Sequence, residues 1–127
     1  MSKHVLVIDD DEDIRKSFVL GLEELTYHVD TASSGQEGLE KEKTKHYDLI
    51  LLDLKMPDMD GTEVLKRIRK RNKEIPIYIV TAFYKEFTDE LTPIKKEGLA
   101  YEILKKPLSS KQIQLAVKGI IEGSAVY

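Results

Sequence analysis

The sequence contains no cysteine, no apolar stretch of membrane-spanning length and no excess of basic charge. Without cysteine, a disulfide framework, a thiolate zinc site and a catalytic thiol are all excluded. The first apolar run, residues 5–8, is too short for a signal-peptide core and acids follow it at once, so we expect a cytoplasmic protein that does not enter the membrane. The 20 basic and 23 acidic side chains give a net charge of -3, which does not support direct nucleic-acid binding.

The composition fits one soluble globular domain, because 41% of the 127 residues are apolar and 34% are charged. Five apolar runs alternate with amphipathic stretches: HVLVID, YHVDTA, YDLILLD, IPIYIVTA and YEILKKP. The first, third and fourth runs are continuous, which is typical of strands buried on both faces of a parallel sheet. This alternation predicts an α/β fold, a doubly wound five-stranded parallel sheet with helices on both faces. We expect the domain to span residues 1–122 and residues 123–127 to be a frayed tail or the start of a linker.

Apolar residues at helical spacing mark the faces expected to pack on the sheet. The clearest sets are Ile14, Phe18, Leu22 and Leu25; Val64, Leu65 and Ile68; and Ile113, Ala116, Val117, Ile120 and Ile121. Ser34, followed three residues later by Glu37, predicts a capping box at the start of the second helix.

The ends of the predicted strands carry polar side chains. The first run ends in Asp9 and Asp10, the third in Asp53, the fourth in Thr81 and the fifth in Lys106. In a doubly wound fold the carboxyl ends of the strands form the edge that binds ligands, so we expect these five residues to converge there. The three histidines, at positions 4, 28 and 46, lie near strand starts and are predicted to pack at the far edge without a metal or catalytic role.

Five acids in a row, residues 9–13, repel one another, and solvent, a helix terminus or a cation must offset that cost. We assign Asp11, Glu12 and Asp13 to the first turn of a helix, as capping and solvated residues. Oxygen ligands with no thiolate or imidazole favour a hard cation at the remaining carboxylates, Mg²⁺ above all. Asp53 beside a metal and Lys106 is then a plausible nucleophile toward phosphorus, giving an aspartyl phosphate.

These motifs together resemble the receiver domain of the response-regulator family of two-component signalling, over residues 3–122. The resemblance rests on the acidic pair Asp9 and Asp10, on LLDLKMPDMDG around Asp53, on VTA at Thr81, and on LKKPL at Lys106. It implies a flavodoxin-like strand order, 2-1-3-4-5. It also implies that Asp53 accepts a phosphoryl group from the phosphohistidine of a sensor histidine kinase or a phosphotransfer protein.

The same resemblance implies the roles of the other site residues. Asp10 and Asp53 are expected to bind Mg²⁺ directly, together with the backbone carbonyl of Lys55, and Asp9 through water. Thr81 and Lys106 are expected to hold the phosphoryl oxygens. Phosphorylation is then expected to change the conformation of the face formed by the fourth helix, the fifth strand and the fifth helix. This face is expected to bind an output partner, whose identity is unknown, or a second copy of the chain in a homodimer. In this interpretation the chain is a signalling switch and not an enzyme acting on other substrates, since it catalyses only its own phosphoryl transfer and dephosphorylation.

The sequence departs from the family pattern near the expected switch, which involves Thr81, Ile103 and Tyr101. The position of Ile103 is usually aromatic, and Tyr101, two residues earlier, is expected to leave the strand on the same face and to substitute in part. Phe83 is bulky where it would screen Asp53 from water. Pro93 falls inside the expected fourth helix, so we predict that this helix is short, kinked or begins near Pro93. The Lys106–Pro107 bond is predicted to be cis.

Two other functions use related chemistry. A Mg²⁺-dependent phosphohydrolase with an aspartyl-phosphate intermediate would need a second acid two residues after the nucleophile, where this chain has Lys55. A flavin-binding module of the same fold would need a phosphate-cradling loop after the first strand, where this chain has acids. The hydrolase remains the alternative to the signalling function.

Overall fold

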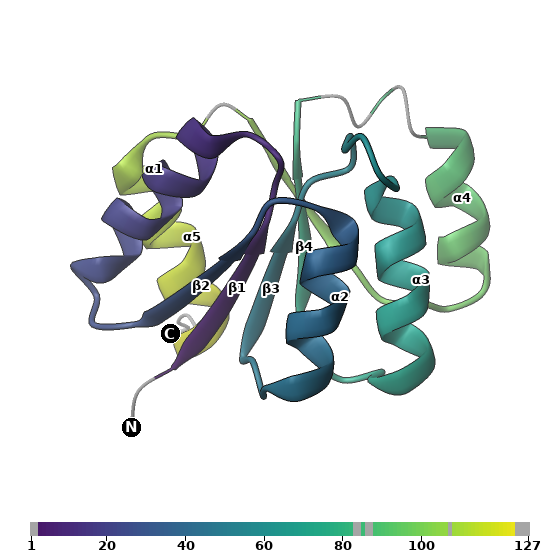
Figure 1. Ribbon diagram of the computed structural model, residues 1–127, viewed down its shortest axis with the longest axis horizontal. Helices are drawn as coiled ribbons and strands as arrows, with labels where there is room; N and C mark the ends of the chain where they lie inside the picture. The colour runs from purple at the N-terminus through teal and green to yellow at the C-terminus, as the bar shows by residue number, and fades with distance from the viewer. Residues whose placement is uncertain (1–2, 83–84, 86–87, 107, 124–127) are drawn as a thin grey trace.

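The computed structural model describes residues 3–82, 85, 88–106 and 108–123. Five parallel strands form one sheet in the order β2-β1-β3-β4-β5, which confirms the predicted doubly wound, flavodoxin-like topology (Figure 1). The strands are β1 (His4–Ile8), β2 (His28–Ala32), β3 (Leu49–Leu52), β4 (Ile77–Thr81) and β5 (Glu102–Lys105). The helices are α1 (Glu12–Glu23), α2 (Gly35–Thr44), α3 (Gly61–Arg71), α4 (Thr88–Lys96) and α5 (Ser110–Glu122). The predicted cis bond at Pro107, the position of Phe83 and all but the first residue of the predicted tail lie outside the described residues.

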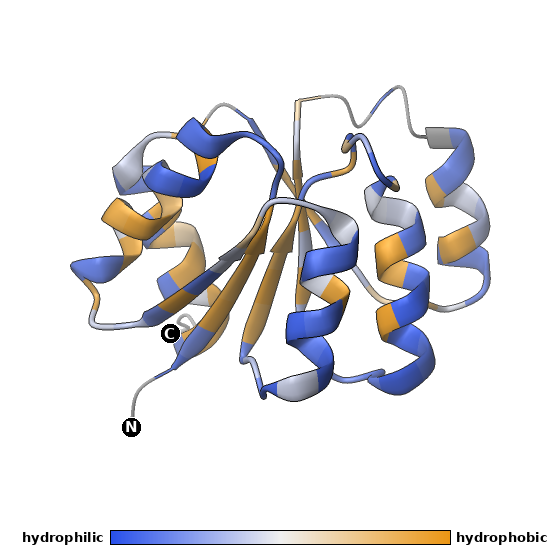
Figure 2. Ribbon diagram, viewed as in Figure 1, coloured by the Kyte–Doolittle hydropathy of each residue, from blue (hydrophilic) through white to orange (hydrophobic). Residues whose placement is uncertain are grey.

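Alternate side chains of the sheet enter two separate hydrophobic clusters, because neighbouring residues of a strand point to opposite faces. On one face Leu6, Ile8, Ile50 and Leu52 pack against α2, α3 and α4; on the other Val5, Val7, Leu49 and Leu51 pack against α1 and α5. The helices lie on the two sides of the sheet in this grouping, and the central strands are apolar along their length (Figures 1 and 2). Burial on both faces explains why β1 and β3 are continuous apolar runs.

The apolar helix faces predicted from the sequence pack on the sheet, and most of their large side chains are buried. Phe18, Leu22, Ile113 and Val117 are buried in the cluster under α1 and α5, with Ile14, Leu25, Ile120 and Ile121 partly buried against it. The residues Val64, Leu65 and Ile68 of α3 are fully buried on the other face.

Helix starts follow the side-chain capping chemistry of the sequence. The carboxylate of Asp11 accepts hydrogen bonds from the backbone N–H groups of Asp13 and Ile14, at 2.8 and 3.2 Å, so Asp11 caps α1 as predicted. The capping box predicted at α2 is correct only in its first half. The Ser34 hydroxyl accepts from the Glu37 N–H at 3.1 Å, but the Glu37 carboxylate accepts from the N–H and hydroxyl of Ser33, one residue before the cap.

Pro93 lies inside α4, which at nine residues is the shortest of the helices in the described ranges. The prediction of a short helix is therefore confirmed, while a start near Pro93 is wrong, because α4 begins at Thr88. The helix tolerates proline in its second half, and the Pro93 carbonyl still accepts a hydrogen bond from the Glu97 N–H at 3.0 Å. Only Leu91 and Ile94 of this helix enter the core, as far as the described side chains show.

The histidines lie at the amino ends of the strands, on the edge opposite the carboxyl ends. His4 and His28 are register partners on β1 and β2, and their rings stack with centroids 4.8 Å apart. His46 precedes β3, and its Nε2 atom is 3.5 Å from the Asp48 carboxylate. Among the helices in the described part of the chain, none has both the length and the apolar character needed to cross a bilayer.

Candidate phosphoacceptor and metal site

The predicted site residues follow directly on the carboxyl ends of β1, β3 and β5. Backbone hydrogen bonds extend the sheet by one residue at each of these positions: Asp9 N–H donates to Ala32, Asp53 N–H to Ile8, and Lys106 N–H to Thr81, at 2.9–3.1 Å. Because the backbones are fixed by the sheet, the side chains start from defined positions at its edge. The sheet therefore brings the two acidic segments and Lys106 together, as the strand-end pattern predicts.

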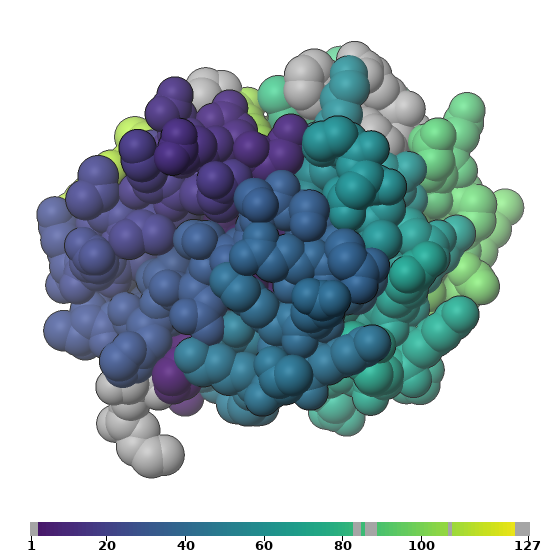
Figure 3. Space-filling model, in the orientation of Figure 1, coloured from purple at the N-terminus to yellow at the C-terminus, as the bar shows by residue number. Residues whose placement is uncertain are grey.

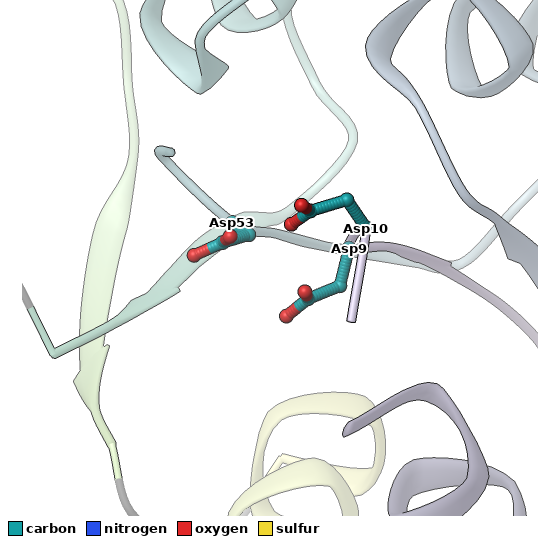
Figure 4. Close-up of side chains that lie close together, drawn as sticks. All are labelled: Asp9, Asp10 and Asp53. Carbon is teal, nitrogen blue, oxygen red and sulfur yellow. The ribbon is translucent and has the colours of Figure 1, made fainter. Parts of the chain in front are cut away.

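Three carboxylates meet at this edge. One oxygen from each of Asp9, Asp10 and Asp53 lies within 4.8 Å of the others. Figure 4 shows Asp9 and Asp10 leaving neighbouring positions of one segment beside Asp53. Asp9 and Asp53 are 3% and 6% exposed, whereas Asp10 is exposed to solvent. Two buried charges and one exposed charge of the same sign thus share one small space.

Lys106 is the cation of this group. Its Nζ atom lies 2.9 Å from Asp9 Oδ2 and 3.3 Å from Asp53 Oδ1, so one ammonium bridges both buried carboxylates. The link to Asp53 is the one expected from the sequence, but the shorter link to Asp9 is not. Lys106 is predicted to hold a phosphoryl group, and Asp9 is predicted to contact the metal through water. In the structure the two side chains form an ion pair with each other.

The electrostatics of the site raise the pKa of Asp53 to about 6. Burial is the main cause, because it disfavours the charged carboxylate, and the negative charge of Asp9 adds to it. Lys106 opposes both effects without cancelling them. For Lys106 burial lowers the pKa, but the hydrogen bond to Asp9 and the charges of Asp53 and Asp9 outweigh it, so the pKa of Lys106 is raised. The cluster therefore holds more negative charge than one ammonium balances.

Two residues that sequence reasoning missed hold Asp9 in place. The Asp9 carboxylate accepts the Asp11 N–H at 3.0 Å through its second oxygen. The Arg15 guanidinium donates to the Asp9 backbone carbonyl at 2.8 Å. Arg15 belongs to α1, so the helix that follows the acidic segment also braces it. The sequence signal for this contact is Arg15 itself, a basic residue in the first turn of the helix that follows the acids.

The segment between β3 and α3, which carries Lys55, is anchored at three points. The Asp58 carboxylate accepts the Gly35 and Gln36 N–H groups at the start of α2, at 3.1 and 2.9 Å, and Asp60 caps α3. Gly61 lies so close to the site that an added Cβ would be 2.3 Å from the backbone carbonyl oxygen of Asp53. Asp58, Asp60 and Gly61 belong to the motif LLDLKMPDMDG, an ordinary turn signal that gave no indication that they fix the backbone beside Asp53.

The predicted switch residues lie on β4 and at β5. Thr81 ends β4 and is fully buried. Tyr101 and Ile103 belong to the same hydrophobic cluster, Tyr101 buried and Ile103 partly buried, which confirms that they share a face of the sheet. The Lys95 ammonium of α4 lies over the Tyr101 ring, 4.9 Å from its centroid. The Tyr101 side chain thus connects β5 to α4.

Mg²⁺ fits the donor set of this site. Carboxylate oxygens are its preferred protein ligands, and the three oxygens are close enough for one ion to contact more than one of them. The raised pKa of Asp53 marks a carboxylate cluster that a divalent cation would relieve. Asp9, Asp10 and Asp53 supply the carboxylate oxygens of this set. The direct contacts from Asp10, Asp53 and the backbone carbonyl of Lys55, and the water-mediated contact from Asp9, stay predictions.

Comparison with known proteins agrees with this geometry. The family model "Response regulator receiver domain" matches residues 5–118. The alkaline phosphatase synthesis transcriptional regulatory protein PhoP of Bacillus subtilis is 38% identical over 99% of this chain and 51% of the relative. The transcriptional regulatory protein SrrA of Staphylococcus aureus is 35% identical over 95% of this chain and 48% of its own length. The chain thus spans about half the length of these curated relatives.

Solved structures show the same fold. A CheY-like response regulator receiver domain protein from Methanospirillum hungatei superimposes with a TM-score of 0.85, at 28% identity over 97% of this chain and 96% of that one. The response regulator TrrA of Thermotoga maritima, crystallised in complex with Mg²⁺-BeF, gives a TM-score of 0.79 at 34% identity over 93% and 98% of the two chains. With the family match over most of its length, the chain belongs to the response regulator receiver domain family of two-component signalling.

Proposed function

We propose that the chain is a phosphoacceptor switch in which Asp53 takes up a phosphoryl group from the phosphohistidine of a sensor histidine kinase or a phosphotransfer protein. The observation that carries the proposal is the position of Asp53. It is a buried carboxylate at the end of the central strand, 3.3 Å from the Lys106 ammonium and within 4.8 Å of the oxygens of Asp9 and Asp10. A structural carboxylate has no need of two further acids beside it, whereas a phosphoryl acceptor that works with a metal does.

The chemistry follows from the side chains present. One Asp53 carboxylate oxygen attacks phosphorus, the new O–P bond forms, and the P–N bond to the donor imidazole breaks. The imidazole nitrogen keeps the electron pair of that bond and takes a proton from solvent. Lys106 then exchanges its contact with the Asp53 carboxylate for a phosphoryl oxygen, and the Thr81 hydroxyl is proposed to donate to another.

When bound, Mg²⁺ supplies positive charge that balances the carboxylates and the phosphoryl oxygens. Asp53 needs that balance, because its raised pKa shows that the site disfavours its charged, nucleophilic form. Asp9 is held by Asp11, Arg15 and Lys106, so it keeps its position while the exposed Asp10 is the more accessible ligand. The anchored Asp58 and Gly61 fix the backbone on which the Lys55 carbonyl lies.

For the conformational change we propose that α4, more than a swinging aromatic side chain, carries the response. This helix is short, contains Pro93 and enters the core through only Leu91 and Ile94 among its described side chains. Tyr101 is already buried beneath Lys95, so it has little room to move inward. The test measures amide hydrogen exchange of residues 88–98 before and after phosphorylation. The exchange rate in α4 should change on phosphorylation both in the wild type and in Tyr101→Ala. Loss of the response in Tyr101→Ala would make the tyrosine the gate, and no response in the wild type would end the proposal.

The partners follow from family membership. Response regulators receive their phosphoryl group within two-component signalling, and we propose the same for this chain, with the face formed by α4, β5 and α5 available to an output partner or to a second copy. A homodimer through this face, the cytoplasmic location and the absence of direct nucleic-acid binding stay predictions. Gel filtration with and without beryllofluoride and Mg²⁺ measures the first of these.

The test of the phosphoacceptor uses acetyl phosphate. In Mg²⁺ the wild type should gain the mass of one phosphoryl group, and Asp53→Asn should gain none. Asp48→Asn is the matched control, because Asp48 precedes the same strand at its other end and its side chain accepts the His4 N–H at 2.9 Å, which asparagine can still do. Labelling of Asp53→Asn at the wild-type level would refute the assignment.

The same preparation separates the signalling switch from the phosphohydrolase. A hydrolase should release free phosphate from common phosphoesters over many turnovers, whereas the switch should release only the phosphoryl group that it has itself accepted. Multiple turnovers that disappear in Asp53→Asn would favour the hydrolase.

A further inference from the structure

The end of α3 and the residues after it form the most basic segment of an acidic chain. Residues 66–73 contain six lysine and arginine side chains and no acid, whereas the whole chain carries a net charge of -3. Figure 2 shows the end of α3 as a hydrophilic part of that helix. Two of the six are neutralised, Arg67 by Glu63 at 2.8 Å and Arg71 by Glu42. Among the described residues Lys66, Arg69, Lys70 and Lys73 form no ion pair.

Arg69 is the unusual member of this set, because it is only 2% exposed. Its Nε and Nη2 atoms donate to the Ala100 carbonyl at 3.0 and 2.7 Å, and Nη1 donates to the Asn72 carbonyl at 3.1 Å. Carbonyl dipoles satisfy hydrogen bonds but supply no negative charge, and a buried charge is costly when no opposite charge is near. Burial accordingly lowers the pKa of Arg69. Three of the five guanidinium N–H groups are used, which leaves two that can donate to a ligand.

The unpaired cations surround a hollow of about 240 Å³ between α3 and the connection from α4 to β5. It is lined by Lys66, Arg69, Lys70, Lys73, Glu97 and Leu99, so Glu97 is the one acid among the described lining residues. Lys66 and Lys70 are four residues apart on α3, which places them on one face of the helix, and Lys73 lines the same hollow from the segment that follows the helix. Helices α3 and α4 lie side by side in Figures 1 and 3.

We propose that this hollow binds a compact multivalent anion of the phosphate class, such as a diphosphate group, between Arg69 and the three lysines. Arginine recognises phosphate through parallel N–H donors, and the lysines add mobile point charges. The volume is below the usual range of pockets for drug-sized ligands, ~300–1,000 Å³, and so suits a small ligand.

A nucleic-acid backbone is the less suitable occupant. Nucleic acid needs a continuous basic stripe, and here the neighbouring cations Arg67 and Arg71 are already paired with glutamates. Glu97 lines the hollow itself and Glu74 lines the neighbouring hollow that shares Arg69 and Lys73, so acids interrupt the positive surface. The site is remote from Asp53 in the fold, at the opposite end of α3, so the proposal does not depend on phosphorylation.

The experiment titrates the protein with sodium pyrophosphate in EDTA, at constant ionic strength, and follows backbone amide chemical shifts. Saturable shifts are expected in residues 66–73 and 97–100. In Lys66→Gln/Lys70→Gln the affinity should fall about tenfold or more, because two charge-assisted hydrogen bonds are removed. Lys111→Gln/Lys118→Gln removes the same charge from exposed positions of α5 and should change the affinity less than about twofold.

Each other outcome overturns the proposal. Shifts that do not saturate, or an equal loss in both double variants, would mean general charge screening. Shifts confined to residues 9, 10, 53 and 106 would place the anion at the carboxylate edge of the sheet. Tighter binding of a DNA duplex than of pyrophosphate, compared at equal phosphate concentration, would assign the surface to nucleic acid. Because both lysines are exposed, the double variant is expected to fold even where an Arg69 variant does not.

Discussion

Replacing Asp53 by asparagine should stabilise the metal-free protein. In the wild type the pKa of Asp53 is raised from 3.8 to about 6, chiefly by burial and then by the charge of Asp9. This difference corresponds to ~3 kcal/mol, since one pKa unit represents about 1.4 kcal/mol. Asparagine keeps the shape and one acceptor for Lys106 but carries no charge. The raised pKa already includes the attraction of Lys106, so ~3 kcal/mol is the upper bound, and because the asparagine amide is itself buried we expect a net gain of about 1–3 kcal/mol in the free energy of unfolding at pH 8.

The sign of the pH dependence follows from the direction of the shift. A carboxyl group whose pKa is higher in the folded state binds protons more readily there, so the folded wild type is favoured as the pH falls. Its charge penalty is complete above about pH 7, decreases as the pH falls through 6, and is gone below the unfolded value near 3.8. The advantage of Asp53→Asn should therefore shrink in the same window. Titrating groups that do not interact with Asp53 are shared by the two proteins and cancel in the difference, and Lys106, whose pKa is raised above its ordinary value, stays charged throughout this pH range.

The assay is urea unfolding of both proteins in EDTA between pH 4 and 8, repeated in Mg²⁺. With metal at ~100 times its dissociation constant, the free energy of unfolding of the wild type should rise by ~2.7 kcal/mol and that of the variant by less. The difference in stability between the two proteins should therefore become smaller or change sign. Asp48→Asn, outside the cluster, should show neither effect. A variant that is less stable than the wild type in EDTA at pH 8, or a difference that does not change with pH, would refute the electrostatic account of the site.

Three further predictions concern the residues around Asp53. Asp10→Asn should lose most of the stabilisation by Mg²⁺ seen in thermal melts of the wild type, because a metal ligand and a charge are removed; an unchanged shift would exclude Asp10 as a ligand. Gly61→Ala should cost about 2 kcal/mol or more in urea unfolding and slow labelling by acetyl phosphate, because its Cβ would lie 2.3 Å from the Asp53 carbonyl oxygen, whereas Gly21→Ala, whose Cβ meets ordinary contacts at 3.5 Å, should be neutral or slightly stabilising. Asp58→Ala should cost ~1 kcal/mol in the free energy of unfolding at neutral pH, because its hydrogen bonds to α2 are lost. Burial raises the pKa of Asp58, but the N–H groups of Gln36 and Gly35 outweigh burial, so this pKa is lowered in the fold. The cost should therefore begin to decrease when the pH falls below 3.8, the pKa of an ordinary aspartate, and should be lost as the pH falls through the lower pKa of the folded state. An equal cost of Asp58→Ala at acid and neutral pH would show that its charge is not what holds α2.

The sequence by itself determined the sheet and the edge where the site lies. Continuous apolar runs such as residues 49–52 require burial on both faces, and their alternation with amphipathic stretches implies parallel strands covered by helices. Once the strands are parallel, residues that follow them, such as Asp9, Asp53 and Lys106, must meet at one edge. Local chemistry also determined the cap at Asp11, because its partners lie two and three residues away.

Only the tertiary structure decided the interactions between groups that are distant along the chain. The ion pair between Lys106 and Asp9 joins residues 97 positions apart, and the hydrogen bond from Arg69 to Ala100 joins residues 31 positions apart. The periodicity of the sequence therefore predicts neither interaction. Burial of Arg69, like the raised pKa of Asp53, depends on how closely neighbouring elements exclude water, and that is a property of the packed structure. Helix α4 shows the same limit at the level of an element: proline predicts a disturbed helix, but packing of Leu91 and Ile94 against the sheet decides that the helix extends on both sides of Pro93.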